Sequence, residues 1–151
     1  PPPPPPPDII LPPPPRKTLE LDRRQRQMCI RDSVMCVHLG LLERERAAQL
    51  EMLTERIGEH VPDDEPLIIA GDFNDWRMRA EQHLHKDLNL NELFVTMRGR
   101  HARTFPVWAP VLPVDRIYFR GLEPVDCSRK SRGHWRDLSD HAALFGIFEL
   151  G

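Results

Sequence analysis

The sequence predicts a mixed α/β domain, and three observations indicate this class. Two apolar runs, VMCVHL at 34–39 and PLIIAG at 66–71, have the composition of buried strands. A charged segment with helical periodicity lies between them, and a shorter one follows. The apolar runs after residue 113 are again strand-like. Strands that alternate with helices, followed mainly by strands, are typical of mixed α/β folds.

The first three elements follow from local patterns. Residues 34–39 are rich in β-formers and predict a buried strand. Residues 66–71 are continuously apolar, which predicts a strand covered on both faces. Between them, residues 41–60 predict a helix that ends near Gly58. The apolar side chains on one face of that helix are Leu42, Leu50, Leu53 and Ile57.

The later elements are less regular. Asp75 is expected to cap a short helix that runs to about Leu84. Residues 87–94 predict a segment packed under a loop. The three prolines of 104–113 predict a rigid loop. The remaining expectations are a strand at 114–119 broken by Asp115 and Arg116, a polar irregular stretch at 121–135 and a final strand at 142–150.

Residues 1–33 form a leader that we exclude from the fold prediction. Eleven of the 17 prolines lie in the first 15 residues, and proline fixes φ and donates no backbone hydrogen bond. Residues 16–33 are charged and weakly patterned. We expect this leader to be disordered or artefactual, with the folded domain at 34–151.

Bulk composition excludes several classes of protein. The formal net charge is −2, which argues against a polyelectrolyte binder that acts by charge alone. The three cysteines have no CxxC spacing, so a disulfide framework or a zinc site is not expected. We expect a reducing, cytoplasmic compartment. No apolar run approaches the ~20 residues that span a bilayer, so no transmembrane segment is predicted.

Asp72 and Asn74 follow the strongest predicted strand. Two residues apart on an extended segment, their side chains leave the same side. A carboxylate there can orient and deprotonate a water, and an amide can hydrogen-bond a phosphate oxygen. The alternative is a plain turn, because Gly, Asp and Asn are common in turns.

Acids and imidazoles also lie at the ends of other predicted strands. Asp140 offers the hard oxygen that Mg²⁺ or Mn²⁺ prefers, and His141 can bind a phosphate or transfer a proton. Asp115 interrupts an apolar strand, and a buried acid needs a partner such as a histidine. His38 ends the first strand. The alternatives are a surface loop at 139–141 and a structural histidine at position 38.

Taken in order, four motifs resemble the last four motifs of the endonuclease/exonuclease/phosphatase superfamily. They are His38-Leu39, Gly71-Asp72-Phe73-Asn74, Asp115-Arg116-Ile117 and Ser139-Asp140-His141. The resemblance covers about residues 34–150 and implies a DNase I-like two-sheet α/β sandwich flanked by helices (α/β/β/α), with the site at one rim. It also implies a divalent-metal-dependent phosphoester hydrolase, with phosphodiesters favoured over monoesters.

The resemblance implies a role for each matching residue. Asp72 orients or deprotonates the attacking water, Asn74 binds the scissile phosphate, and Asp140 helps to hold Mg²⁺ or Mn²⁺. His141 contacts the phosphate and is oriented by Asp115, and His38 is a second phosphate-side histidine. Three further side chains are candidates for binding substrate: Trp108, Arg132 and Arg136. Rim packing for Trp108 and a solvated loop for the two arginines are the alternatives.

The amino-terminal half of the family, with an early asparagine and a metal-binding glutamate, has no counterpart in the leader. We therefore expect a carboxyl-terminal half domain that is weakly active or inactive, with the inner face of one sheet exposed. The implied substrate is a nucleic acid, a phospholipid or a sugar phosphate, and no obligate protein partner is expected. The alternative function is a non-catalytic remnant that binds a partner through its exposed half-sheet.

Overall fold

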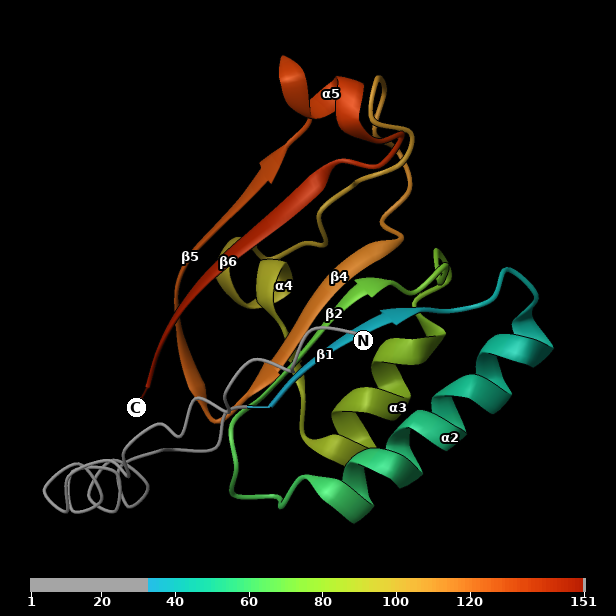
Figure 1. Cartoon of the computed structure of the whole chain (residues 1–151), viewed down its shortest axis with the longest axis vertical. Helices are drawn as coiled ribbons and strands as arrows, with labels where there is room; N and C mark the ends of the chain where they lie inside the picture. The colour runs from blue at the N-terminus through green and yellow to red at the C-terminus, as the bar shows by residue number, and fades with distance from the viewer. Residues whose placement is uncertain (1–32, 151) are drawn as a thin grey trace, which may run out of the picture. The chain divides into compact units, whose positions relative to one another are not determined.

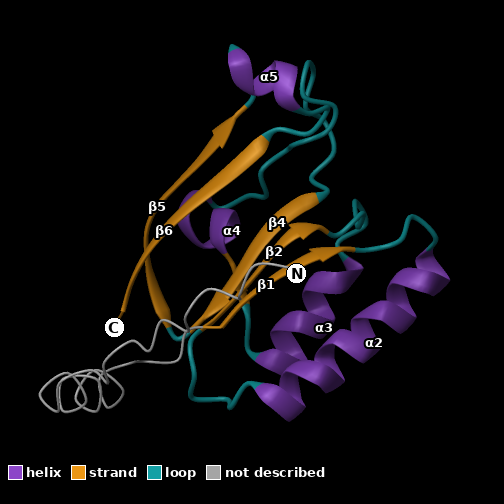
Figure 2. Ribbon diagram, in the orientation of Figure 1, coloured by secondary structure: helices purple, strands orange, loops and turns teal. Residues whose placement is uncertain are grey.

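The computed structural model describes residues 33–150, which form two sheets and four helices (Figures 1 and 2). A four-stranded sheet has the order β1 (Ser33–His38), β2 (Leu67–Asp72), β4 (Asp115–Arg120) and β3 (Asn91–Glu92). A second sheet pairs β5 (Leu122–Lys130) with β6 (Ala143–Leu150). The helices are α2 (Glu43–His60), α3 (Arg79–Leu88), α4 (Leu93–Arg98) and α5 (His134–Leu138).

Two hydrophobic cores lie on opposite faces of the four-stranded sheet. Helices α2 and α3 cover one face, where Leu67 and Ile69 of β2 are fully buried. The β5–β6 ribbon and α4 cover the other face, where Ile68 and Ala70 pack. Phe119 of β4 contacts Phe148 of β6 across this second core, with ring centroids 5.2 Å apart. The continuously apolar β2 is thus covered on both faces, as its composition predicts.

Strand register brings the polar ends of three strands together. β1 and β2 are parallel, with His38 opposite Asp72. β2 and β4 are antiparallel, with Asp72 opposite Asp115. Because neighbouring strands lie about 4.8 Å apart, one residue from each strand forms a row across this edge of the sheet.

Gly71 permits β1 and β2 to approach closely beside this row. Its φ of +143° is one that side chains rarely adopt. A Cβ at this position would lie 2.0 Å from the carbonyl oxygen of Val37. Only glycine fits here without displacing β1 from β2.

The structure corrects several element boundaries. α2 ends at His60, the last residue of the predicted range 41–60, with Gly58 inside it, and it begins at Glu43 rather than at Leu41. α3 begins at Arg79, and Asp75 is not its N-cap residue, although Asp75 Oδ2 accepts a hydrogen bond from the Ala80 amide at 2.6 Å. Asp115 and Arg116 do not break β4, because they lie in its regular ladder. Ser33, assigned to the leader, begins β1, and residues 1–32 lie outside the described residues.

The stretch expected to be irregular between residues 121 and 135 contains the longest strand of the described chain. β5 spans nine residues and pairs with β6 at eight of them, with a register shift between Pro124 and Asp126. Its partner strand lies at residues 143–150, close to the predicted 142–150. No helix within residues 33–150 is long and apolar enough to cross a membrane.

Candidate active site

The candidate site begins with the row of polar side chains at one edge of the four-stranded sheet. His38 is the last residue of β1, Asp72 the last of β2 and Asp115 the first of β4. His38 Nε2 lies 3.7 Å from Asp72 Oδ2, and the His38 side chain is 78% exposed. The two carboxylates are half-buried. The row therefore presents one exposed imidazole and two partly shielded acids to solvent.

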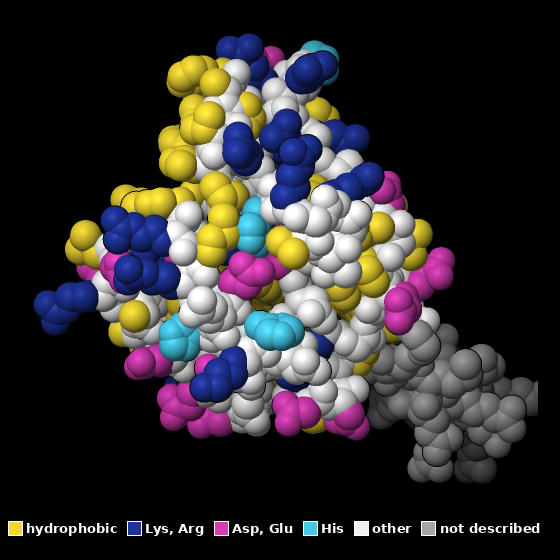
Figure 3. Space-filling view, turned by 180° about the vertical axis from the view of Figure 1, so that it is seen from behind, with side chains coloured by type: hydrophobic (Ala, Val, Ile, Leu, Met, Phe, Trp, Pro, Cys, Tyr) yellow, Lys and Arg dark blue, Asp and Glu magenta, His cyan; other side chains and the backbone are white. Residues whose placement is uncertain are grey.

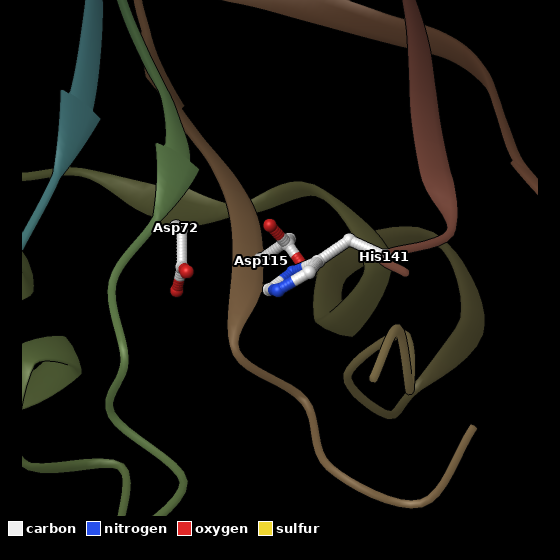
Figure 4. Close-up of side chains that lie close together, drawn as sticks. All are labelled: Asp72, Asp115 and His141. Carbon is white, nitrogen blue, oxygen red and sulfur yellow. The ribbon is translucent and has the colours of Figure 1, made fainter. Parts of the chain in front are cut away.

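His141 completes the site from the second sheet, just before β6 (Figure 4). Its Nδ1 lies 2.8 Å from Asp115 Oδ2. A carboxylate accepts, so Nδ1 carries the proton and Nε2 is the ring atom left for substrate. The segment is held in place because the Ala142 amide donates to the Thr104 carbonyl at 2.8 Å. The Thr104 hydroxyl in turn accepts from the Asp115 amide at 3.2 Å.

Asp72, Asp115 and His141 form a compact cluster. Each offers one ligand atom, and these three atoms lie within 4.8 Å of one another. Figure 4 shows the Asp72 carboxylate facing the Asp115–His141 pair from the neighbouring strand. Two carboxylates and an imidazole this close can hold a cation or position a water beside a phosphoryl group.

Burial and neighbouring charges shift the pKa values of two groups in the cluster. Burial raises the pKa of the Asp72 carboxyl above its ordinary value, although the hydrogen bond from the Asn74 amide opposes this. Asp115 raises the pKa of Asp72 further by charge repulsion. Burial by itself lowers the pKa of His141, but the hydrogen bond and charge of Asp115 outweigh it, so this pKa is raised overall. The charges of Asp72 and Asp140 act in the same direction.

The His141 pKa gives a direct test of this geometry. In metal-free protein, ¹H–¹⁵N NMR titration should place the pKa of His141 above its ordinary value of 6.5. Asp115→Asn should lower it, because the amide accepts a weaker hydrogen bond and carries no charge. The stability that the pair contributes is fully present below pH 6.5 and is lost as the pH rises through the raised pKa. An unchanged His141 titration in Asp115→Asn would contradict the pairing.

Asn74 is used structurally at the end of β2. It is 8% exposed and has a left-handed φ of +49°. Its Nδ2 donates to the Leu39 carbonyl at 2.7 Å, and its backbone amide donates to Asp72 Oδ1 at 2.8 Å. Asn74 therefore ties the ends of β1 and β2 together and orients the Asp72 carboxylate. Binding of the scissile phosphate by Asn74 stays a prediction.

Arg116 is a supporting residue, although the sequence indicated it only as an interruption of the strand predicted at 114–119. It is 1% exposed. Its Nη2 donates to the carbonyls of Asp75 at 2.5 Å and Pro113 at 3.1 Å, and its Nη1 donates to the Tyr118 hydroxyl at 3.0 Å. Arg116 therefore fastens the β2–α3 loop to the start of β4. The sequence signal was a charged residue within an apolar strand, which needs partners when buried.

The remaining predicted site residues lie outside this cluster of three groups. Asp140 is exposed and is not one of the three clustered groups, although its carbonyl accepts from the Val107 amide at 2.6 Å. Trp108 is 67% exposed on the 104–113 loop, and Arg132 and Arg136 are exposed between β5 and β6. On the face seen in Figure 3, acidic and histidine side chains lie beneath a group of Lys and Arg side chains. The structure thus brings together His38, Asp72, Asp115 and His141, and not Asp140.

Two facing sheets with carboxylates and imidazoles at one rim define the class: a DNase I-like sandwich. The chain belongs to the endonuclease/exonuclease/phosphatase family, whose sequence model matches residues 2–141. It is 50% identical over 117 residues to the uncharacterized protein YbhP of Escherichia coli K12. That match covers 78% of this chain and 46% of YbhP, so the chain spans about half the length of the relative.

Solved structures show the same fold. D. rerio TDP2 in complex with a single-strand DNA product is similar with a TM-score of 0.61 at 19% identity, over 77% of this chain and 55% of that one. The human Nocturnin catalytic domain with bound sulfate is similar with a TM-score of 0.55 at 23% identity, over 77% of this chain and 46% of that one. At these identities the likeness establishes the DNase I-like fold and nothing finer.

Proposed function

We propose that this chain is the carboxyl-terminal part of a divalent-metal-dependent phosphodiester hydrolase. One observation carries the proposal: three chemically competent groups, Asp72, Asp115 and His141, converge within 4.8 Å. They come from three separate segments, in a chain that belongs to a family named for phosphoester-cleaving enzymes. A structural ion pair would need two such groups at most, so a second acid beside the Asp115–His141 pair supports a catalytic role.

In this proposal Asp72 is the general base. Burial raises the pKa of its carboxyl, which makes the ionised carboxylate a stronger base. His141, with Nδ1 bound to Asp115, points its second nitrogen toward the phosphate and donates a hydrogen bond or proton there. Asn74 holds the Asp72 carboxylate in place through its backbone amide. His38 supplies a second imidazole on the exposed side of Asp72.

The carboxylate oxygens of the site are the type of ligand that a hard divalent cation prefers. Asp72 and Asp115 each use one carboxylate oxygen in a hydrogen bond and keep the other, and Asp140 adds an exposed carboxylate nearby. These residues would hold Mg²⁺ or Mn²⁺, with Asp140 the predicted ligand. Because such ions take about six oxygen ligands, we expect weak binding. When bound, the ion would supply charge stabilisation to the phosphoryl oxygens.

The proposed substrate is a nucleic acid, a phospholipid or a sugar phosphate. Nucleic acid is consistent with the DNA product held by D. rerio TDP2, and an anionic group with the sulfate held by Nocturnin. Trp108, Arg132 and Arg136 are proposed to bind the parts of the substrate that flank the scissile phosphate, because their side chains are exposed on the segments that precede Asp115 and His141 in the chain. The proposed compartment is the cytoplasm.

Metal titration tests this proposal without relying on turnover. Mn²⁺ is paramagnetic, so its binding should broaden the NMR signals of His141 before those of His60, an exposed histidine on α2. Slow hydrolysis of bis(p-nitrophenyl) phosphate should accompany Mn²⁺ or Mg²⁺ and stop on addition of EDTA. Broadening that favours His60, or hydrolysis that persists in EDTA, would contradict the proposal.

The second candidate function is a non-catalytic remnant that binds a partner through its exposed sheet face. Exposed apolar side chains on β1 and β6 favour it: Val34 is 68% exposed, Ile147 56% and Leu150 51%. Such side chains are often interaction surfaces. Partner binding that is unaffected by EDTA and by Asp72→Asn would support the remnant over the enzyme.

A further inference from the structure

A second cavity, lined by arginines, lies beside the candidate active site and is not used by the proposed chemistry. Its volume is about 870 Å³, within the range of small-molecule sites. Arg98, Arg100 and Arg103 line it from the end of α4 and the segment that follows, and Arg129 lines it from β5. Apolar side chains, among them Phe94 and Val111, form the rest of the wall.

The positive charge of this arginine pocket is largely uncompensated. No Asp or Glu is among its lining residues. Arg98 is partnered by Asp126 at 3.4 Å. Within residues 33–150, the guanidinium groups of Arg100 and Arg103 make no hydrogen bond or ion pair, and that of Arg129 makes one bond, from Nη1 to the Arg103 carbonyl at 2.7 Å. Three arginines that line this cavity therefore have guanidinium donors to spare.

The segment that carries these arginines is held rigidly. Gly99, in a left-handed conformation with φ +71°, ends α4 and donates to the Val95 carbonyl at 2.9 Å. His101 is wedged between two carboxylates, with Nε2 3.0 Å from Glu81 and Nδ1 3.4 Å from Glu92. Fixing the backbone on both sides of Arg100 lowers the entropy lost when a ligand binds.

From this arrangement we infer that the arginine pocket is a second binding site, for an anion that carries two or more phosphate groups. Guanidinium groups bind phosphate oxygens in a two-pronged fashion, and three of them exceed what one phosphate requires. The apolar wall suits the organic part of such a ligand. The pocket adjoins the hydrolytic site, because Pro113 lines it two residues before Asp115. The inference does not depend on hydrolysis.

Pyrophosphate is the simplest probe. Isothermal titration of the 151-residue chain in EDTA should detect pyrophosphate binding. The double substitution Arg100→Ala/Arg103→Ala should weaken it by at least about tenfold. The double substitution to lysine should lie in between, because lysine keeps the charge and loses the two-pronged geometry. Arg56→Ala on α2 is the matched control, since Arg56 is also exposed and lies outside the pocket.

A further variant separates this pocket from the hydrolytic site. In His141→Ala, pyrophosphate binding should persist. Binding that is lost in His141→Ala and unchanged in the double alanine variant would place the anion at the hydrolytic site and overturn the inference. So would the absence of any binding. The arginine variants should keep the thermal midpoint of the parent, because the substituted arginines are exposed.

Competition then identifies the source of the phosphates. ATP and a short single-stranded oligonucleotide are compared for their ability to displace pyrophosphate. Stronger displacement by the oligonucleotide indicates that the pocket binds a strand that extends from the hydrolytic site. Stronger displacement by ATP indicates a free nucleotide ligand. Failure of both to displace pyrophosphate would contradict a site for organic phosphates.

Discussion

Replacing Asp72 with asparagine is expected to lower phosphodiester hydrolysis by a factor of about 10²–10⁴. The amide has nearly the shape of the carboxylate but cannot accept a proton from water. Its neighbours should stay in place, because the Asn74 amide can still donate to the side-chain oxygen that replaces Asp72 Oδ1. The effect therefore reports loss of the base rather than loss of structure.

The same substitution should leave the protein at least as stable as before. Burial raises the pKa of the Asp72 carboxyl, which means that the surroundings disfavour its charge. A neutral amide removes that penalty. Initial rates with Mn²⁺ and thermal melting of the same samples check both statements. The control is Asp64→Asn, because Asp64 is an exposed acid that precedes the opposite end of β2. Retained activity, or a fall in both activity and melting temperature, would reject Asp72 as the base.

Gly71→Ala is expected to destabilise the fold by about 3 kcal/mol or more. The new methyl group would lie 2.0 Å from the Val37 carbonyl oxygen, well inside van der Waals contact. The φ of +143° is also unfavourable for alanine. β1 must move away from β2, which breaks ladder hydrogen bonds and displaces the adjacent Asp72 from His38. We expect the hydrolytic site to be lost together with stability.

Urea denaturation followed by circular dichroism measures this effect. The matched control is Gly58→Ala, because Gly58 lies within α2 and nothing stands within 4 Å of the position of its Cβ. Alanine there should stabilise the protein by about 0.5–1 kcal/mol, since it lowers the entropy of the unfolded chain and favours the helix. If Gly71→Ala resembled Gly58→Ala, the close approach of β1 and β2 would be wrong.

The local sequence pattern predicted the strands that consist of continuous apolar runs. β2 was evident from five apolar residues before Gly71, and β6 from a similar run. β5 was missed because its composition is polar and includes Pro124, and its strand character comes from pairing with β6. Such pairing depends on residues distant in sequence, which propensity alone does not describe.

The sequence also predicted one part of the functional residues and missed another. Asp72, Asp115 and His141 were predicted because each stands out beside an apolar run. The arginine pocket was not, because Arg129 meets Arg103 from 26 residues away and an exposed arginine has no distinctive local pattern. The hydrogen bond from Asn74 to Leu39 was hidden for the same reason, since it spans 35 residues.

The pleat of β4 has a consequence for how such a protein can change over evolutionary time. Asp115 and Arg116 are neighbours that serve opposite faces, one joined to His141 and the other buried against Tyr118. The ladder from Ile117 onward fixes the register of β4. Inserting or deleting a single residue directly after the pair, inside the strand, would therefore exchange the two faces, placing a guanidinium beside His141 and an acid among carbonyl oxygens. Viable length changes at this point of the strand should come in even numbers.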